Sequence, residues 1–246
     1  MRQTKIRLSI PTYSQEVYFE TTRSIIDTLQ TTENAEIHVE FASISALTFN
    51  FNKLLYNAYY SDCDYWVLLH ADLAAKERDW LTILINEMKA EGLGVISAVA
   101  AIKSFEGLTS VALDTREHFP RRLTLTEIHE GVAVLTNEKA KRFYGNNLLI
   151  NTGMMVWDMD IMRKHVPDLP FEFHDGWYTN LTEQGEVMCP YFHPEDWIMS
   201  QKLDKLGIPF GTTRSVHTLH KGTFVFDSSK TWGNPQDQQW LNAKKE

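Results

Sequence analysis

The run Tyr65-Trp66-Val67-Leu68-Leu69 constrains the fold more than any other feature of the sequence. All five residues are apolar, so neither face of a strand formed by them is suited to contact with water. Such uninterrupted runs are typical of strands covered on both faces, as in the middle of a parallel sheet. The run gives way at once to His70-Ala71-Asp72, so we expect polar side chains directly after a buried strand.

Strand and helix patterns alternate around this run. Apolar residues at helical spacing predict helices within residues 16–29, 47–58 and 81–88. Further strands are expected at Lys5–Ile10, which stops at Pro11, at Glu36–Phe41 and at Gly94–Ala101. This order is typical of βαβ units with right-handed crossovers. It predicts an α/β fold with a mostly parallel central sheet flanked by helices.

The second half of the chain is less regular. Residues 107–122 are polar and are expected to form a loop or a lid, and residues 171–190 follow no clean period. Leu148–Trp157 is predicted to be a strand interrupted by Asn151-Thr152-Gly153. Pro194–Leu206 has the signals of a helix, with proline at its opening, two acids in its first turn and a glycine just beyond its end.

Composition argues against several classes of protein. The formal net charge of -8 disfavours a protein that coats nucleic acid by neutralising phosphates, and the basic runs at 121–122 and 139–142 are interpreted as solvated surface. Two cysteines, Cys63 and Cys189, are too few for a disulfide framework and indicate a reducing compartment. No apolar stretch approaches the length of a membrane span, so we expect a cytoplasmic protein.

The first candidate for chemistry is the pair His70 and Asp72. Residues two apart in an extended segment point the same way, and ligands of open sheets bind at strand ends. Carboxylate and imidazole suit Mg²⁺ or Mn²⁺, and such an ion stabilises a diphosphate leaving group. The alternative, a strand-end histidine followed by an aspartate that caps the next helix, is the commoner situation.

Three further groups are weak signals when taken alone. Glu195-Asp196 suits the positive end of a helix, and one of its carboxylates could also take a proton from a hydroxyl. His217 and His220, just before Gly222, could complete a metal site or be structural. Thr152-Gly153 inside a strand marks either a plain bulge or a closely approaching ligand.

The order of these groups resembles the GT-A superfamily of glycosyltransferases over nearly the whole chain. Pro11-Thr12-Tyr13 resembles the first nucleotide-contacting loop of that family, and His70-Ala71-Asp72 resembles its DxD motif. Leu148–Trp157 is similar to the acceptor-side strand, and Pro194-Glu195-Asp196-Trp197 to the xED motif. His220-Lys221-Gly222 resembles the C-terminal metal-binding histidine region.

The resemblance implies a GT-A type fold, in which a Rossmann-like, mostly parallel central sheet is joined by a smaller antiparallel portion on the acceptor side. It implies one glycosyltransferase domain over the whole chain. Its parts are a nucleotide-binding half at 1–102, an acceptor-side half at 103–226 and a C-terminal tail at 227–246. The tail is expected to fold back over the domain through Trp232 and Trp240.

The resemblance also implies an activity. The enzyme is expected to move a sugar from a nucleotide-sugar donor, a UDP-sugar, to an acceptor hydroxyl with help from Mn²⁺ or Mg²⁺. Asp72 and His220 would bind the metal, with His70 as a further ligand and His217 in reserve. Asp196 would be the catalytic base of an inverting reaction.

Other residues are implied to surround the substrates. Glu195 would orient the acceptor or the donor. Trp177 and Tyr178 are expected either to stack on a sugar or to pack in the usual way. The residues implied to border the donor's nucleotide and sugar are Pro11, Thr12, Tyr13, Glu40, Asn52, Thr152 and Gly153.

One departure from the family pattern leaves alternatives open. His70 stands where the family has the first aspartate of DxD, which puts the metal's identity and the metal dependence in question. A sugar-phosphate nucleotidyltransferase would need a Gly- and Arg/Lys-rich loop after the first strand, which Pro11-Thr12-Tyr13-Ser14 does not provide. A catalytically inactive nucleotide-sugar-binding module is the other alternative. The acceptor stays open between a glycan, a lipid, a protein and a modified nucleic-acid base.

Overall fold

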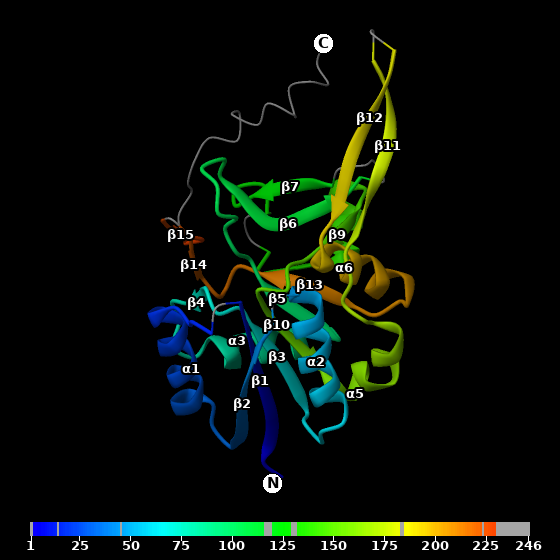
Figure 1. Cartoon of the computed structure of the whole chain (residues 1–246). Coiled ribbons are helices and arrows are strands. Elements are labelled where there is room, and N and C mark those ends of the chain that lie inside the picture. The colour runs from blue at the N-terminus through cyan, green and yellow to red at the C-terminus, as the bar shows by residue number, and fades with distance from the viewer. Residues whose placement is uncertain are drawn as a thin grey trace.

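A seven-stranded sheet is the centre of the molecule, in the order β2-β1-β3-β10-β5-β13-β8 (Figure 1). The computed structural model describes residues 2–13, 15–44, 46–115, 120–128, 132–182, 185–222 and 224–229. The strands of this sheet are β1 (Thr4–Thr12), β2 (Ala35–Ser43), β3 (Tyr65–Leu69), β5 (Val95–Ala98), β8 (Val134–Thr136), β10 (Met154–Asp158) and β13 (Phe210–Thr213). Only β8 and β10 of these described strands run against the rest. The predicted α/β fold with a mostly parallel sheet is confirmed.

Helices cover both faces of this sheet. One buried cluster joins the sheet to α1 (Phe19–Thr31) and α3 (Trp80–Ala90). The other joins it to α2 (Leu47–Tyr59), α4 (Asn137–Tyr144), α5 (Met159–Met162) and α6 (Glu195–Lys205). A 3₁₀ helix, η1 (Arg163–Asp168), follows α5. Among the helices of the described ranges, none combines the length and hydropathy of a membrane span.

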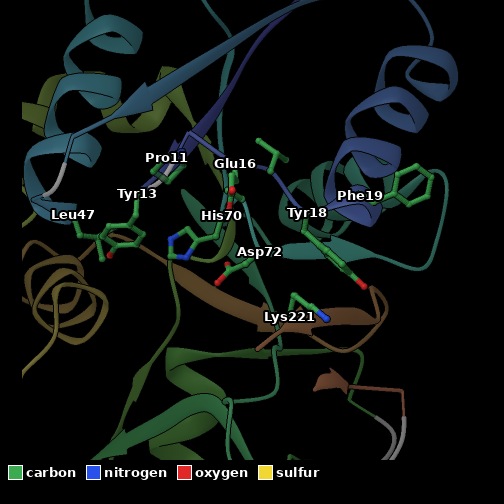
Figure 2. Close-up of a pocket in the computed structure, with 11 residues that line it drawn as sticks. Pro11, Tyr13, Glu16, Tyr18, Phe19, Leu47, His70, Asp72 and Lys221 are labelled. Atoms are coloured by element: carbon green, nitrogen blue, oxygen red, sulfur yellow. The ribbon is translucent and has the colours of Figure 1, made fainter. Parts of the chain in front are cut away.

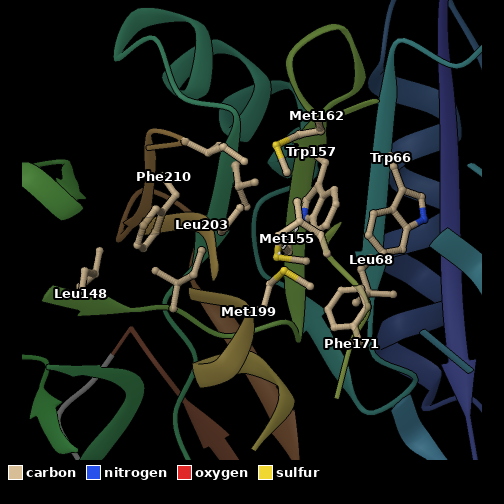
Figure 3. Close-up of a cluster of buried hydrophobic side chains, with 14 of the residues drawn as sticks. Trp66, Leu68, Leu148, Met155, Trp157, Met162, Phe171, Met199, Leu203 and Phe210 are labelled. Atoms are coloured by element: carbon tan, nitrogen blue, oxygen red, sulfur yellow. Dashed lines mark hydrogen bonds between the residues drawn. The ribbon is translucent and has the colours of Figure 1, made fainter. Parts of the chain in front are cut away.

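The apolar run in β3 is buried on both faces, as its composition predicts. Trp66 and Leu68 belong to the cluster with α2 and α6, whereas Val67 belongs to the cluster with α1 and α3. Trp66 packs edge-on against Trp157 at a ring-centroid distance of 5.0 Å, with Phe171 beside both rings (Figure 3). The indole N–H of Trp66 donates to a buried serine hydroxyl at 3.0 Å, so this core leaves the ring's polar group satisfied.

Smaller antiparallel sheets flank the main one. One contains β6 (Leu108–Asp114), β7 (Arg121–Thr124) and β9 (Asn147–Leu149), and another contains β4 (Leu73–Ala75), β14 (Thr218–Lys221) and β15 (Val225–Asp227). The strands β11 (His174–Thr182) and β12 (Gly185–His193) form a hairpin that extends away from the body of the molecule (Figure 1).

One sequence expectation about this part of the chain is wrong. The described part of residues 107–122 is not a polar loop, because β7 begins at Arg121 and β6 is almost entirely buried. Its polar residues are satisfied by backbone: the hydroxyl of Thr109 donates to the carbonyl of Leu123 at 2.7 Å, and that of Ser110 accepts from the N–H of Ala100 at 3.1 Å. The stretch at 171–190, for which the sequence shows no clean period, covers β11 and most of β12.

A smaller correction concerns Pro11, which does not end the first strand. β1 continues to Thr12, although β3 pairs with it only at residues 6–9. Pro11 therefore has a strand neighbour on one side only, a place where its missing N–H is tolerated. The interruption of Leu148–Trp157 and the helix after Pro194 are confirmed. Trp232 and Trp240 lie outside the described residues.

Candidate functional site

Strand ends bring the candidate residues to one edge of the main sheet. β1 and β3 run in parallel and end at Thr12 and Leu69, and β10 runs against β3 and begins opposite Leu69. The backbone N–H of His70 donates to the carbonyl of Gly153 at 2.8 Å, which joins the end of β3 to the start of β10. Ligands of open α/β sheets bind at this edge, beyond the carboxyl ends of the strands.

A pocket of about 550 Å³ opens at this edge (Figure 2). Its volume lies within the ~300–1,000 Å³ that is typical of small-molecule sites. Two backbone hydrogen bonds of 2.8 Å hold its walls, one from the N–H of Tyr18 to Ala71 and one from the N–H of Lys221 to Asp72. The residues that line it are Pro11, Tyr13, Glu16, Val17, Tyr18, Phe19, Leu47, His70, Ala71, Asp72 and Lys221.

Asp72 and His220 lie side by side because β4 pairs with β14. The antiparallel register sets His220 opposite Leu73, next to Asp72. Oδ1 of Asp72 is 3.8 Å from Nε2 of His220. Nδ1 of His220 is 2.7 Å from the carbonyl oxygen of Ala101, and a carbonyl only accepts, so Nδ1 carries the proton. The lone pair of Nε2 is therefore on the side of the ring that faces Asp72.

His70 lines the same pocket as a neutral side chain. Its ring lies 5.3 Å from the ring of Phe51, and its Nε2 is 3.5 Å from the hydroxyl of Thr152. Burial lowers the pKa of His70 to about 4, although the charge of Asp72 acts in the opposite direction. At neutral pH the imidazole can therefore donate or accept a hydrogen bond but brings no charge.

Lys103 brings a positive charge to Asp72 from the segment after β5. Its ammonium group forms an ion pair with Oδ2 of Asp72. Burial acts to raise the pKa of Asp72, but His70, Lys103 and His220 outweigh burial and hold this pKa below its ordinary value. Burial also lowers the pKa of His220. With both imidazoles neutral at pH 7, Lys103 is the partner that still carries charge.

Asp72 and His220 fit a divalent cation that is bound partly by substrate. A carboxylate oxygen and an imidazole lone pair face each other, and both are ligands that Mn²⁺ accepts. Across the described ranges, no three His, Cys, Asp or Glu side chains gather into a complete metal site. Phosphate oxygens and water would therefore supply the other positions, as they commonly do when Mg²⁺ binds with a nucleotide.

The start of α6 brings a second acidic group to this region. The hydroxyl of Ser200 donates to the carbonyl of Asp196 at 2.8 Å and accepts from the N–H of Ile150 at 2.9 Å. This ties the first turn of α6 to the segment that leads into β10. In that segment Thr152 hydrogen-bonds to Glu195, which acts to lower the pKa of that carboxyl. Because Thr152 also lies beside His70, it links the two acidic groups of the site.

Tyr13 lies near the carboxylates of both groups. Burial raises the pKa of its phenol, and the charges of Glu195 and Asp72 raise it further. Its ring lies beside His70 in the pocket, with Asp72 close by (Figure 2). Residues after β1 and after β3 therefore line one pocket, although they are far apart in the sequence, and Glu195 at the start of α6 acts on Tyr13 from outside the set that lines it.

Asp196 has surroundings that suit proton transfer. Burial, followed by the charge of Glu195, raises the pKa of Asp196 to about 7, and Arg122 acts to lower it. Burial raises the pKa of Glu195 as well. The guanidinium of Arg122 stacks on the ring of Trp197 at 4.9 Å from its centroid, next to Asp196 in the chain. A carboxyl group with a pKa close to the working pH is well placed to accept a proton from a substrate.

Two predicted donor-binding residues are engaged in the fold instead. Glu40 accepts from Arg7 at 2.7 and 2.8 Å and from two further side chains, so its oxygens are already used. The amide group of Asn52 donates to the carbonyl of Phe171 at 2.8 Å and accepts from the N–H of the same residue at 2.7 Å. Neither side chain lines the pocket.

Of the remaining predicted residues, some line the pocket and others lie away from it. His217 pairs with Glu77 through Nδ1 at 2.6 Å, whereas His220 is the histidine that faces Asp72. Thr12 is buried, and its hydroxyl accepts from the N–H of Gln15 at 3.2 Å. Pro11 and Tyr13 do line the pocket. The side chains of Trp177 and Tyr178 lie outside the described part of the hairpin.

Three cations near the site were not predicted from the sequence to act there. Lys103 follows the buried strand β5, as Asp72 follows the buried strand β3. Lys221 lies between two residues of a predicted motif, and its ammonium group is 5.5 Å from the ring centroid of Tyr18. Arg122 is not the solvated surface residue expected from its basic run, because it packs on Trp197.

Comparison with known proteins supports the fold. No family model matches the chain, and no curated protein matches its sequence. The crystal structure of A197 from STIV resembles it with a TM-score of 0.55 over 94% of this chain and 95% of that one, at 12% identity. At this identity the likeness shows a shared fold and nothing about activity.

Two further solved structures resemble the chain more weakly. CMP:2-keto-3-deoxy-manno-octonic acid synthetase in complex with CTP has a TM-score of 0.45 at 13% identity, covering 98% of each chain. The mannosyltransferase PcManGT from Pyrobaculum calidifontis, in complex with GDP-Man and Mn²⁺, has a TM-score of 0.45 at 12% identity, covering 87% of this chain and 55% of that one. Likenesses below 0.5 are too weak to bear on the function of this chain.

Proposed function

We propose that this chain is a glycosyltransferase that moves a sugar from a nucleoside-diphosphate sugar to an acceptor hydroxyl, with a divalent cation at Asp72. One observation carries the proposal. Thr152 connects the surroundings of two differently tuned carboxylates, because it lies beside His70 and hydrogen-bonds to Glu195. Asp72 lies beside Lys103 and two imidazoles, and Asp196 has a pKa of about 7. The first environment suits a diphosphate with its metal, and the second suits a base.

The donor side of the reaction uses positive charge. Asp72 and His220 would hold Mn²⁺ or Mg²⁺, which offsets the negative charge that grows on the leaving nucleoside diphosphate. Lys103 and Lys221 add positive charge at the same end of the pocket. The neutral imidazole of His70 is available as a hydrogen-bond partner for the sugar or for a phosphate oxygen.

The acceptor side uses Asp196. Its carboxylate takes the proton of the acceptor hydroxyl while the hydroxyl oxygen attacks the anomeric carbon, and the bond between that carbon and the diphosphate oxygen breaks. Glu195, whose carboxyl hydrogen-bonds to Thr152 beside His70, orients the sugar between the two groups. With its pKa raised to about 7, Asp196 titrates near neutrality, which suits a base that works there.

A two-step experiment tests the proposal. UDP-, GDP-, TDP- and CMP-sugars are first screened with and without Mn²⁺ for a rise in melting temperature, because a ligand of the folded state stabilises it. The donor that stabilises most, a UDP-sugar by our expectation, is then assayed for hydrolysis and transfer. Binding without either reaction would favour an inactive binding module. Activity with a nucleoside triphosphate and a sugar phosphate would favour a nucleotidyltransferase.

A further inference from the structure

Lys103 already occupies part of the proposed cation site. Its ammonium group pairs with Oδ2 of Asp72, while Oδ1 of the same carboxylate faces Nε2 of His220 at 3.8 Å. A metal ion that joined this carboxylate would lie close to a like charge. The lysine and the metal therefore cannot both use Asp72 without a loss of binding free energy for one of them.

The backbone around Lys103 and Gly222 directs this side chain to Asp72. A Cβ atom on Gly222 would lie 3.2 Å from Cδ, 3.4 Å from Cγ and 3.5 Å from Cβ of Lys103, so the absence of a side chain at Gly222 makes room for the lysine stem. The N–H of Ser104 donates to the carbonyl of Ile102 at 2.8 Å, which closes a tight turn around Lys103. The contact with Asp72 thus follows from fixed backbone features on both sides.

The ion pair is also easy to exchange. The side chains of Lys103 and Asp72 are 38% and 39% exposed, and ion pairs with this much access to water contribute little to stability. A lysine on a flexible stem can turn from a carboxylate to a nearby phosphate without change in the backbone. The diphosphate expected at Asp72 would offer such a phosphate within the same pocket.

We propose that Lys103 is an exchangeable cation, which pairs with Asp72 in the unliganded protein and moves to the donor diphosphate when the metal takes its place. The inference rests on the proposed function, since it requires a metal and a diphosphate at Asp72. It has a thermodynamic consequence. Metal alone must displace the lysine and binds weakly, whereas metal with diphosphate gives the lysine a new partner. The two ligands therefore strengthen each other's binding by the same factor.

The test compares Lys103→Met with the wild-type protein. Methionine keeps an apolar stem over Gly222 and removes the charge. Mn²⁺ binding is measured from the electron paramagnetic resonance signal of free Mn²⁺, first for the metal alone and then with UDP or GDP, and UDP and GDP binding is measured calorimetrically. Lys76→Met is the matched control, because it removes an ammonium group paired with Asp227 instead of Asp72.

We expect Lys103→Met to bind Mn²⁺ alone about tenfold more tightly than the wild type, and Lys76→Met to leave that affinity unchanged. The factor by which UDP or GDP strengthens Mn²⁺ binding should fall by a similar amount in Lys103→Met. Equal or weaker binding of Mn²⁺ alone to Lys103→Met overturns the exchange, even if the wild type binds nucleotide and metal normally. Failure of both proteins to bind Mn²⁺ with either nucleotide overturns the exchange and the proposed function together.

Discussion

Asp72 and Asp196 are the same type of residue, but their surroundings shift their pKa values in opposite directions. Lys103 and two imidazoles hold the pKa of Asp72 below its ordinary value. Burial beside Glu195 raises the pKa of Asp196 to about 7. A carboxylate that stays ionised suits a cation and a diphosphate, and one that titrates near neutrality suits proton transfer. The environment, not the residue type, divides the proposed roles.

The two aspartates also differ in how the fold fixes them. Asp72 lies where β3 gives way to β4, and the backbone N–H of Lys221 in β14 donates to its carbonyl at 2.8 Å. Asp196 lies in the first turn of α6, and Ser200 connects this turn to Ile150. The two carboxylates are therefore held by separate elements, Asp72 by the pairing of β4 with β14 and Asp196 by the first turn of α6.

The largest expected effect is that of Asp196→Asn on turnover. The amide cannot take a proton, so kcat should fall by at least ~100-fold, the scale of general-base catalysis. Donor affinity should stay near the wild-type value, because Asp72 and the lysines are untouched. Steady-state kinetics and calorimetry with the donor found by screening measure the two quantities. Asp160→Asn, a change outside the pocket, is the control, and near-full activity in Asp196→Asn would show that the assigned base is wrong.

Asp72→Asn should affect the opposite quantity. Loss of the carboxylate charge should weaken the binding of nucleoside diphosphate in the presence of Mn²⁺ by at least ~tenfold, as expected for a charge-assisted contact. The measurement is nucleotide affinity by calorimetry with and without Mn²⁺. Asp62→Asn is a matched control, since Asp62 also pairs with a lysine but lies on the surface. A metal-dependent affinity that survives Asp72→Asn would contradict the assigned donor side.

A third prediction concerns stability and separates the two aspartates by pH. The pKa of Asp196 is raised from 3.8 to about 7, so between these values the folded chain binds more protons than the unfolded chain. The free energy of unfolding should therefore fall as pH rises through this window. Asp196→Asn should remove ~1 kcal/mol or more of that fall between pH 5 and pH 8, since one pKa unit corresponds to ~1.4 kcal/mol.

Denaturant unfolding of the wild type and of Asp196→Asn at both pH values measures this difference. Other groups titrate in the same range, but they are common to both proteins and cancel, apart from the coupling to Glu195. Identical pH dependence in the wild type and Asp196→Asn would mean that Asp196 is ionised in the folded protein well below pH 7, and it would remove the contrast with Asp72.

Much of the donor side could be predicted from the sequence. The apolar run in β3 marks a buried strand, and the rule that ligands bind beyond strand ends points directly to His70 and Asp72. Helix signals placed Glu195-Asp196 at the start of α6. These features are local, because burial, capping and strand termination leave a trace within a few residues.

What the sequence could not reveal depends on partners that are distant in the chain. Glu40 accepts a hydrogen bond from Arg7, which lies 33 positions away in the chain, and no local sequence pattern indicates this contact. The strand β6 contains threonine and serine that resemble loop residues until their backbone partners are known. Lys103 belongs to no motif. Only the pairing of β4 with β14 brings His220 next to Asp72, the carboxylate with which Lys103 pairs.

The smallest expected effect tests how Asp196 is tuned. Arg122 acts to lower the pKa of Asp196, so Arg122→Met should raise that pKa, and the rising limb of the pH profile of kcat/KM should move to higher pH by up to ~1 unit. The neighbour Arg121 pairs with Glu127 instead, and Arg121→Met should leave the midpoint in place. Arg122→Lys keeps the charge but loses the flat stacking on Trp197, so a midpoint restored by lysine would identify charge as the cause. If Arg122→Met lowers activity equally at every pH, Arg122 supports the start of α6 by packing and the pKa of Asp196 is set by burial and Glu195 alone.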